Sequence, residues 1–403
     1  MKLKRRKRLV KLKNGLRIAY KKTKEKAVYL ELLVKAGSGH EESTAKGVAH
    51  YLEHVKFNTK KYGEAENAFR VAKENSIQLN AYTYKRETNY NIKTLPESID
   101  IALDLLKQIV FHSDLTESYI EKERGIIQNE IARRPEYIKD YNFNSKIYDG
   151  LFADNVIALP EQVAGLTFKN IMDFQEKYYV PNNMCLIIAG PCGKQKELME
   201  KIKPLFEEYE FKKIKKTKRN ELKKENHIEF NEKEDQTYKI NIAAIVSEKE
   251  NDLKQRIIYN ISAKCITEKL NDYFREELSM VYNIRAGVEK LEKQYVLQIR
   301  TDLQGKEVIE DFLAKFESYK TKINLLITEE LIQRNVKSSI TAKKFKEDDS
   351  ETFIDDTIVY ELEGVKVDTE KEFLKVINEI TAIEIKEAIE KMLKQEMYTV
   401  VVN

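Results

Sequence analysis

The residues of this sequence whose types and spacing could do chemistry are gathered in one short stretch. Two of the five histidines, His50 and His54, stand four residues apart, and Glu53 lies beside the second. On an α-helix, residues four apart project from the same face, so both imidazoles could bind one metal ion from consecutive turns. Glu53 would project to the other side of His50, within reach of a water on that ion. His-x-x-Glu-His is a zinc-peptidase spacing, the reverse of His-Glu-x-x-His. The alternative is a helix surface that carries two histidines and an acid by chance.

A metal centre of this kind needs a third ligand, and a second helix offers one. Regularly spaced isoleucines form an apolar stripe over residues 118–133, with Thr116 as the expected N-cap and Pro135 as the expected stop. Glu123 and Glu130 fall on the flank of that stripe, two turns apart. Ionised carboxylates facing a core are costly unless they are paired, hydrogen-bonded or bound to metal. With a metal motif upstream, Glu130 is the natural third ligand and Glu123 a residue that orients a ligand. The alternative is that both glutamates reach water at the edge of the domain.

The elements that must position these side chains follow from hydrophobic periodicity and turn residues. Ser43 or Thr44 is expected to cap the helix that carries the histidines, and Gly47 to let that helix pack closely. The pair Asn14-Gly15 between apolar-containing runs predicts a hairpin. The expected segments are that hairpin over 9–20, strands over 28–34, 77–84, 88–92 and 185–190, and helices over 64–75 and 99–111.

Taken together, the two motifs resemble those of a known family. The stretch from His50 to His54, paired with residues 123–130, resembles the pitrilysin/insulinase family of zinc metallopeptidases, which includes the mitochondrial processing peptidases and smaller bacterial members. Further segments resemble that family at residues 12–16, 36–39, 80–83 and 179–184. The resemblance implies an α+β fold of two homologous modules, each a mainly antiparallel sheet covered by helices.

The resemblance also implies roles for the residues of the motifs. It implies one zinc ion per chain, bound by His50, His54 and Glu130, with a fourth position left for water. It assigns Glu53 the role of general base, and Glu123 a supporting role in catalysis as a residue that orients a ligand. The expected activity is hydrolysis of short or unfolded peptides inside a closed chamber.

Two further segments are expected to bind substrate. Asn80 and Ala81 occupy the position of the family's edge strand, whose backbone groups pair with the peptide as an added strand. In the second half of the chain, Arg275 and Tyr282 resemble the family's arginine and tyrosine that help hold the substrate backbone and the transition state. The alternative is that Arg275 makes a surface ion pair and Tyr282 belongs to a strand.

The chain is expected to contain an internal repeat. Residues 395–403 are weakly similar in sequence to the strand at 185–190, which indicates a repeat of about 200 residues. The expected division is a catalytic zinc-binding module (1–210), a lysine-rich linker (211–225) and a second, non-metal module that contributes to substrate binding (226–403). No histidine follows His227, so the second half cannot build another zinc site of this kind. Residues 343–356 are highly charged and are expected to form an exposed loop or a helix end.

Composition excludes several classes of protein. With 403 residues, 42% hydrophobic and 34% charged, the sequence is typical of a soluble globular protein with two or more domains. No apolar run approaches the ~20 residues of a membrane span, and no secretory signal is recognised. The three cysteines are interpreted as reduced thiols of a cytoplasmic protein. Basic clusters at 2–24 and 212–219 are interpreted as solvated surface and not as a nucleic-acid site, because neither interleaves aromatic residues.

The resemblance also bears on partners. Two modules are half of the family's four-module clamshell, so the other half is expected from a second chain. A homodimer is the simpler expectation, because this chain carries both the metal motif and the segment with Arg275 and Tyr282. A heterodimer with an inactive paralogue stays open.

Two other classes of function also stay open. The chain could be a catalytically silent partner or scaffold subunit, or a nucleic-acid-binding protein. Silent subunits commonly lose the metal residues, whereas all of them are present here.

Overall fold

The computed structural model describes residues 9–134, 136–153, 155–214, 221–230, 237–249, 252–291, 294–346, 349–364 and 369–403. These residues form two compact units, which we describe separately. The first unit contains the described residues of Met1–Ile138, Asp154–Lys218 and Glu347–Val367, and the second those of Lys139–Ala153, Arg219–Lys346 and Asp368–Asn403. Each unit therefore combines segments from both halves of the chain.

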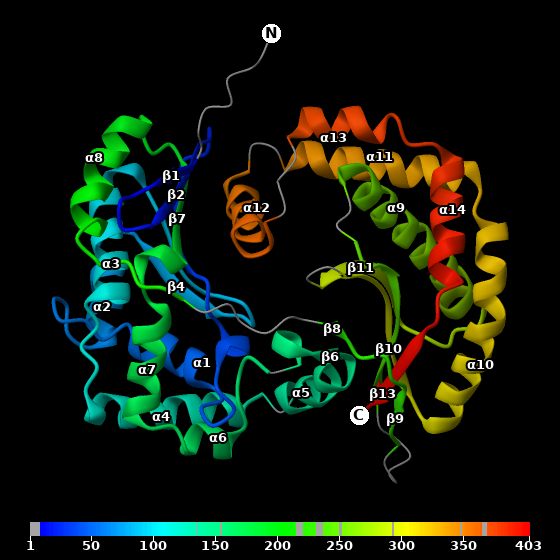
Figure 1. The fold of residues 1–403 in the computed structure, drawn as a ribbon, viewed down its shortest axis with the longest axis horizontal. Coiled ribbons are helices and arrows are strands. Elements are labelled where there is room, and N and C mark those ends of the chain that lie inside the picture. Colours follow the sequence, from blue (N-terminus) through cyan, green and yellow to red (C-terminus); the bar gives the residue numbers. More distant parts are fainter. Residues whose placement is uncertain are drawn as a thin grey trace. The chain divides into compact units, whose positions relative to one another are not determined.

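The first unit is built on a six-stranded sheet with the order β1-β2-β7-β3-β5-β4 (Figure 1). Its strands are β1 (Leu9–Lys11), β2 (Arg17–Lys22), β3 (Val28–Val34), β4 (Gln78–Thr83), β5 (Thr88–Thr94) and β7 (Met184–Gly190). All neighbours are antiparallel except β2 and β7. The predicted hairpin, the strand over 28–34 and the antiparallel pair after it are confirmed. The pair β4–β5 ends the sheet, so β4 is an edge strand.

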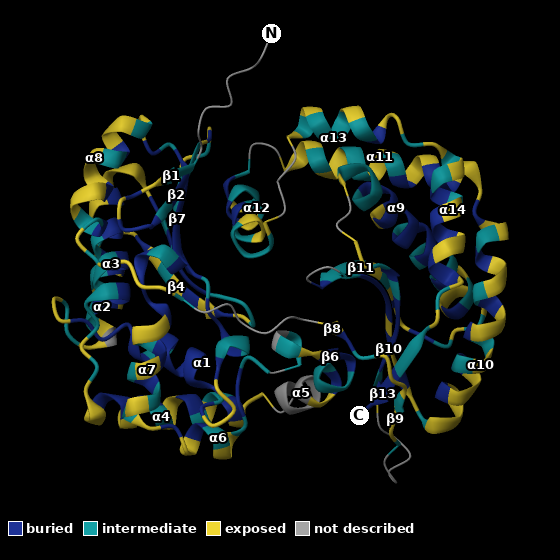
Figure 2. Cartoon of the chain, in the orientation of Figure 1, coloured by how far each residue is buried: buried dark blue, intermediate teal, exposed yellow. Residues whose placement is uncertain are grey.

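Helices cover the two faces of this sheet unequally. The helices of the first unit are α1 (Val48–Val55), α2 (Ala65–Glu74), α3 (Ile99–Phe111), α4 (Glu117–Ala132), α6 (Pro160–Ala164), α7 (Phe168–Tyr178), α8 (Gln195–Phe206) and α12 (Ser350–Glu363). One face carries Leu30 and Leu32 of β3 into the main core with α1, α3 and α4. The opposite face carries Leu33 of β3 and Ile187 of β7 against Ile354 of α12. Residues of the central strands β3 and β7 are buried on both faces, whereas the edge strand β4 is largely exposed, which is the colour difference across this sheet in Figure 2.

Helix α12 corrects part of one prediction made from the sequence. Residues 343–356 were expected to be an exposed loop or a helix end. The end of α11 at Phe345, with exposed residues 344–346, fits that prediction, but α12 begins at Ser350 and packs on the sheet of the first unit. Apolar residues at helical spacing, among them Phe353, Ile354 and Ile358, meet that sheet. Further along α12, Oε1 of Glu361 lies 2.9 Å from Nε of Arg17 and its Oε2 lies 3.5 Å from Nζ of Lys35, so ion pairs to the first unit also hold this helix.

The second unit repeats the topology of the first. Its sheet has the order β11-β12-β10-β13-β9, from strands β9 (His227–Ile228), β10 (Thr237–Ser247), β11 (Ile284–Leu291), β12 (Gln294–Gln304) and β13 (Tyr398–Val402). This order matches β4-β5-β3-β7-β2, and in each sheet one pair is parallel, β9–β13 here and β2–β7 in the first unit. Its helices include α9 (Leu253–Leu270), α10 (Lys306–Ile323), α11 (Glu329–Phe345), α13 (Glu370–Ile377) and α14 (Ala382–Leu393). The predicted α+β class with two related modules is confirmed.

A segment from the first half of the chain completes the second unit. Helix α5 (Glu136–Ile147) leads into β6 (Tyr148–Asp149), which pairs with β8 (Glu221–Leu222). Ile147 and Tyr148 join Leu222 and sheet residues in a small apolar cluster. Within the expected linker 211–225, residues 215–220 lie outside the described residues, as do Pro135 and residues 2–8 of the first basic cluster.

Composition led to expectations about the cysteines and about membrane-spanning segments. All three cysteines are buried and free, as expected of reduced thiols. Over the described parts of the chain, none of the helices combines the length and the apolar character needed to cross a membrane.

Candidate metal centre

Helix α1 carries the histidine motif and begins in an unusual way. Its N-cap is Gly47 with φ +88°, and a Cβ at that position would lie 2.7 Å from the Cβ of Ala158. Only glycine combines that backbone conformation with so close an approach. The prediction of Ser43 or Thr44 as the cap is therefore wrong.

A buried glutamate caps α1 in their place. The carboxylate of Glu41 accepts hydrogen bonds from the backbone N–H of Gly47 at 2.8 Å and of Ala49 at 2.9 Å. These N–H groups have no partner within the helix, and a carboxylate there also interacts favourably with the helix dipole. Sequence reasoning missed Glu41 because it lies outside the usual capping positions.

The structure brings the three predicted ligands together. Nε2 of His50 lies 3.8 Å from Oε2 of Glu130, and Nε2 of His54 lies 3.4 Å from the same oxygen. One ligand atom of each residue lies within 4.8 Å of the other two. Tetrahedral zinc with ligands at about 2.0–2.1 Å places them about 3.3–3.5 Å apart, so a small contraction would complete the site. The donor set of two imidazoles and a carboxylate therefore fits zinc.

Burial and neighbouring charges perturb all three groups. Burial and the proximity of His54 lower the pKa of His50 to about 3, which keeps it neutral, the form that binds a metal. Burial would also lower the pKa of His54, but Glu123, Glu130 and Glu53 outweigh it and raise that pKa to about 9. The contact with His54 holds the pKa of Glu130 below its usual value. Opposite charges thus hold His54 and Glu130 together, whereas His50 beside them is neutral.

Glu123 stands behind the second histidine. Only 7% of it is exposed, and its Oε2 lies 3.7 Å from Nδ1 of His54, the ring nitrogen that faces away from Glu130. A carboxylate in that place favours the tautomer with a proton on Nδ1 and a free Nε2. The predicted location of Glu123 beside a ligand is therefore found.

Glu53 lies next to the three ligands but is held by a different partner. Its Oε2 accepts a hydrogen bond of 2.6 Å from the hydroxyl of Thr83 on the edge strand β4. Burial raises the pKa of Glu53, although the Thr83 hydroxyl and the charge of His54 oppose the rise. One carboxylate oxygen is thereby fixed, which leaves the other for chemistry. No sequence signal pointed to Thr83, because it is 30 residues away.

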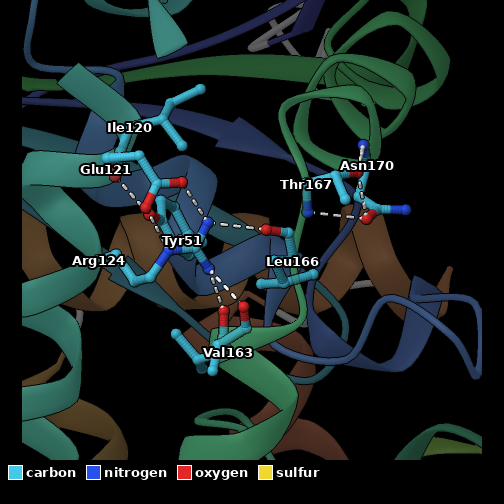
Figure 3. Close-up of polar contacts among 9 residues, drawn as sticks. Tyr51, Ile120, Glu121, Arg124, Val163, Leu166, Thr167 and Asn170 are labelled. Atoms are coloured by element: carbon cyan, nitrogen blue, oxygen red, sulfur yellow. Dashed lines mark hydrogen bonds and ion pairs between the residues drawn. The ribbon is translucent and has the colours of Figure 1, made fainter. Parts of the chain in front are cut away.

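Helices α1 and α4 must be held in register to keep the candidate ligands together, because His50 and His54 lie on α1 and Glu130 lies on α4. The hydroxyl of Tyr51 donates to the carbonyl of Ile120, and the guanidinium of Arg124 lies over the Tyr51 ring (Figure 3). Arg124 also pairs with Glu121 and donates to carbonyls at the end of α6 and just after it, including that of Leu166 at 2.8 Å. Figure 3 shows Arg124 beside the Tyr51 ring and hydrogen-bonded to these groups, so this side chain ties α1, α4 and α6 together.

The end of α1 is anchored by a lysine that has no carboxylate partner among the described residues. Lys56 is 1% exposed, and its amino group donates to the carbonyl of Val110 and the side chain of Gln175 at 2.8 Å each, and to Ser113 at 3.0 Å. Burial lowers its pKa to about 7. The side chain therefore joins α1 to α3 and α7.

The first pair of predicted substrate residues lies on the expected edge strand. Asn80 and Ala81 of β4 pair with Asn91 and Tyr90 of β5, and no strand of the described residues pairs with the other side of β4. The same strand provides Thr83, so the edge and Glu53 are joined directly. The prediction of an edge strand here is confirmed.

The second predicted pair lies in the other unit. Arg275 belongs to the π-helical segment Asn271–Glu277 that continues α9, and its guanidinium lies 5.8 Å from the ring of Tyr282. Tyr282 is 90% exposed and precedes β11, so it is not part of a strand. Arg275 also contacts the neighbouring Glu276 at 3.3 Å. The structure brings these two residues together.

Both halves of the chain are similar to known proteins. Residues 17–146 match the model "Insulinase (Peptidase family M16)", and residues 165–338 match "Peptidase M16 inactive domain". Over 186 residues the chain is 31% identical to an uncharacterized zinc protease of Rickettsia felis, covering 45% of each protein. Over 185 residues it is 29% identical to the rat (Rattus norvegicus) mitochondrial-processing peptidase subunit beta, covering 44% of this chain and 37% of that one. The matches thus span less than half the length of these relatives.

A solved structure matches nearly the whole chain. A protease from Helicobacter pylori superposes with a TM-score of 0.81 and 17% identity, covering 98% of both chains. At that identity the likeness shows a shared fold.

Proposed function

Because this chain belongs to the insulinase family of peptidases, family M16, we propose that it is a zinc-dependent endopeptidase acting on short or unfolded peptides. The observation that carries the proposal is the convergence of His50, His54 and Glu130, with Glu53 beside them. We propose one zinc ion per chain, since the described residues contain one group of this kind. Zinc bound there would act as a Lewis acid that lowers the pKa of a water and polarises the scissile carbonyl.

Glu53 is assigned the role of general base. With Oε2 held by Thr83, its other oxygen takes a proton from the attacking water as the new carbon–oxygen bond forms. The same oxygen then passes that proton to the leaving nitrogen as the carbon–nitrogen bond breaks. Glu123 orients His54 through Nδ1 and does not touch the substrate.

The substrate is proposed to bind as an added strand. The free edge of β4 at Asn80 and Ala81 offers backbone N–H and C=O groups to an extended peptide. A folded protein does not present a strand in this way, which favours unfolded peptides. Arg275 and Tyr282 are the residues that the second unit contributes to substrate binding. They are assigned to hold the substrate backbone and the transition state.

Assembly and location are also proposed. We expect modules near 1–210 and 226–403 to pair with those of a second chain, and we propose a homodimer because one chain carries both sets of site residues. A heterodimer is the alternative, since one relative is named as a subunit. The buried free cysteines favour the cytoplasm.

A catalytically silent partner subunit is the second candidate function. One observation favours it, because residues 165–338 match a family model described as an inactive domain. That match begins at residue 165, whereas the candidate ligands His50, His54 and Glu130 all precede it. The peptidase is therefore the better-supported proposal.

A single substitution tests the proposal. Glu53→Gln should keep zinc bound and lower the hydrolysis of a mixed peptide library by at least about a hundredfold, the usual effect of losing a general base. Zinc is measured by elemental mass spectrometry and cleavage by mass-spectrometric mapping. The matched control is Glu97→Gln, an exposed glutamate that should leave both quantities unchanged. Cleavage by Glu53→Gln at the wild-type rate would refute the role of Glu53, and a zinc-free, inactive wild-type protein would favour the silent subunit.

A further inference from the structure

The second unit has a hollow from which the proposed chemistry uses only Tyr282. Its volume is about 780 Å³, and it lies over one face of the sheet formed by β10, β11 and β12. On β11, Ile284 and Val288 face α9, whereas Arg285, Gly287 and Glu289 point to the opposite face. The α5–β6 segment covers part of that face with apolar side chains and leaves the rest open.

The open part of the face has an excess of positive charge. Arg285 of β11 and Arg300 of β12 are directly opposite each other in the antiparallel register. Like charges in such positions repel, so the pair destabilises the sheet unless an anion lies between them. The hollow is lined by three cationic and two acidic side chains, which are Lys239, Arg285, Arg300, Glu289 and Asp302. One positive charge is left uncompensated.

The partners of these arginines do not remove that charge. Arg300 donates to the neutral oxygens of Asn241, Gln298 and Tyr148, and the nearest carboxylate oxygen, of Glu289, is 3.8 Å away. These contacts use Nε and one terminal nitrogen. Among the described residues, no ion pair or hydrogen bond involves the side chain of Arg285.

Buried polar groups support the same conclusion. Asn241 is fully buried beside Arg300, and its Nδ2 has no acceptor among the described residues. Asn241 does not line the hollow, but its amide oxygen is the partner of Arg300, so the described neighbourhood of Arg300 has an unsatisfied donor and no extra acceptor. A ligand that supplies a negative charge would balance the uncompensated positive charge of the lining.

The position of the hollow connects it to peptide binding. β11 ends its sheet, and the matching strand orders make it the counterpart of β4, the proposed substrate edge. Tyr282, which we assign to the substrate backbone, lines the same hollow. Gly287 leaves room there, because a Cβ at that position would meet nothing within 4 Å.

We propose that this hollow binds a carboxylate of the peptide substrate between Arg285 and Arg300. The proposal rests on the proposed peptidase function for the kind of ligand, but its test does not require cleavage. The carboxylate is either an acidic side chain or the free C-terminus of the peptide. Arginine suits this task because its planar fork of donors matches a carboxylate.

Binding is measured with the full-length chain carrying Glu53→Gln, so that no peptide is consumed. Three fluorescently labelled versions of one unfolded peptide are compared by anisotropy: one with a glutamate and a free C-terminus, one with that glutamate changed to glutamine, and one with a C-terminal amide. Loss of the bound carboxylate should weaken binding about tenfold, which corresponds to 1.4 kcal/mol. The version that binds weakly identifies which carboxylate is held.

Substitutions then locate the site. Arg285→Gln should abolish the preference for the charged peptide, and Arg285→Glu should reverse it in favour of a lysine peptide. Gly287→Val fills open space and suits a strand, so it should melt like the parent while binding the charged peptide about tenfold more weakly. The matched control is Lys322→Gln, which removes one exposed positive charge of α10 in the same unit.

The outcomes separate this proposal from the proposed function. Equal affinity for all three peptides, or an equal effect of Lys322→Gln and Arg285→Gln, would overturn the carboxylate site. So would wild-type affinity in Gly287→Val. A wild-type chain that binds with the expected preference but cleaves nothing would refute the peptidase and leave this site standing.

Discussion

Glu31 provides the sharpest test of how α12 is held on the first sheet. This residue lies in the middle of β3, is 8% exposed, and faces α12. Burial is the largest cause that raises its pKa from 4.5 to about 8, and the charges of Asp355 on α12 and of Glu87 add to it. Ion pairs from Glu361 and Glu363 of α12 to basic residues of the first unit hold the helix in place nearby.

The sign of the pH dependence follows from proton binding. Between pH 4.5 and about 8 the folded protein keeps a proton on Glu31 that the unfolded chain has lost. Stability therefore falls as the pH rises through this range. At about 1.4 kcal/mol for each pH unit, the full rise corresponds to at most about 5 kcal/mol, and water entering a partly opened interface reduces it.

Glu31→Gln removes the group that must ionise. The variant should match the wild type in the free energy of unfolding near pH 5 and exceed it by about 2–4 kcal/mol near pH 9. Urea unfolding at both pH values measures this difference, and hydrogen exchange of α12 shows whether the gain lies at that helix. The control is the exposed Glu97→Gln. A difference between Glu31→Gln and wild type that does not change with pH would show that the reasoning is wrong.

Two further predictions concern the position of α1. Gly47→Ala should lower the free energy of unfolding by about 2–4 kcal/mol and reduce zinc content, because φ is positive and the new Cβ would meet Ala158. Thermal melting and zinc analysis measure both effects. The control is Gly125→Ala, where the new Cβ meets nothing within 4 Å. Equal melting temperatures of Gly47→Ala and Gly125→Ala would contradict the prediction. Tyr51→Phe should cost about 1 kcal/mol of stability and weaken zinc binding several-fold, because it frees α1 from α4. Competition with a chelator measures that affinity, and an unchanged value would refute the coupling.

The parts of the site that could be predicted from sequence depend on local spacing. His50 and His54 are brought to one face by a single helix, and the isoleucine stripe of α4 placed Glu123 and Glu130 correctly on its flank. Thr116 caps α4 as predicted, its hydroxyl accepting from the N–H of Tyr119. Such features require only the 3.6-residue repeat and the known chemistry of helix ends.

The parts that could not be predicted depend on distant partners. Thr83 reaches Glu53 only because β4 runs beside α1. The part of 343–356 that belongs to α12 was misjudged because its charges suggest solvent, whereas Ile354 packs with Leu33 of β3, more than 300 residues away. Local patterns do not specify which face of which sheet an amphipathic helix will cover.

The repeated topology gives a reason for dividing the work between the two modules. In the first, α1 presents His50 and His54 beside an edge strand, whereas α9, which follows the corresponding strand of the second sheet, buries Ile258, Ile261 and Cys265. A helix committed to apolar packing has no room for ligands, but its sheet keeps the free edge at β11. A module that retains the edge and loses the metal side chains can still bind an extended chain. Since an edge pairs with backbone groups of any peptide, charged side chains such as Arg285 are what such a module can add to selectivity.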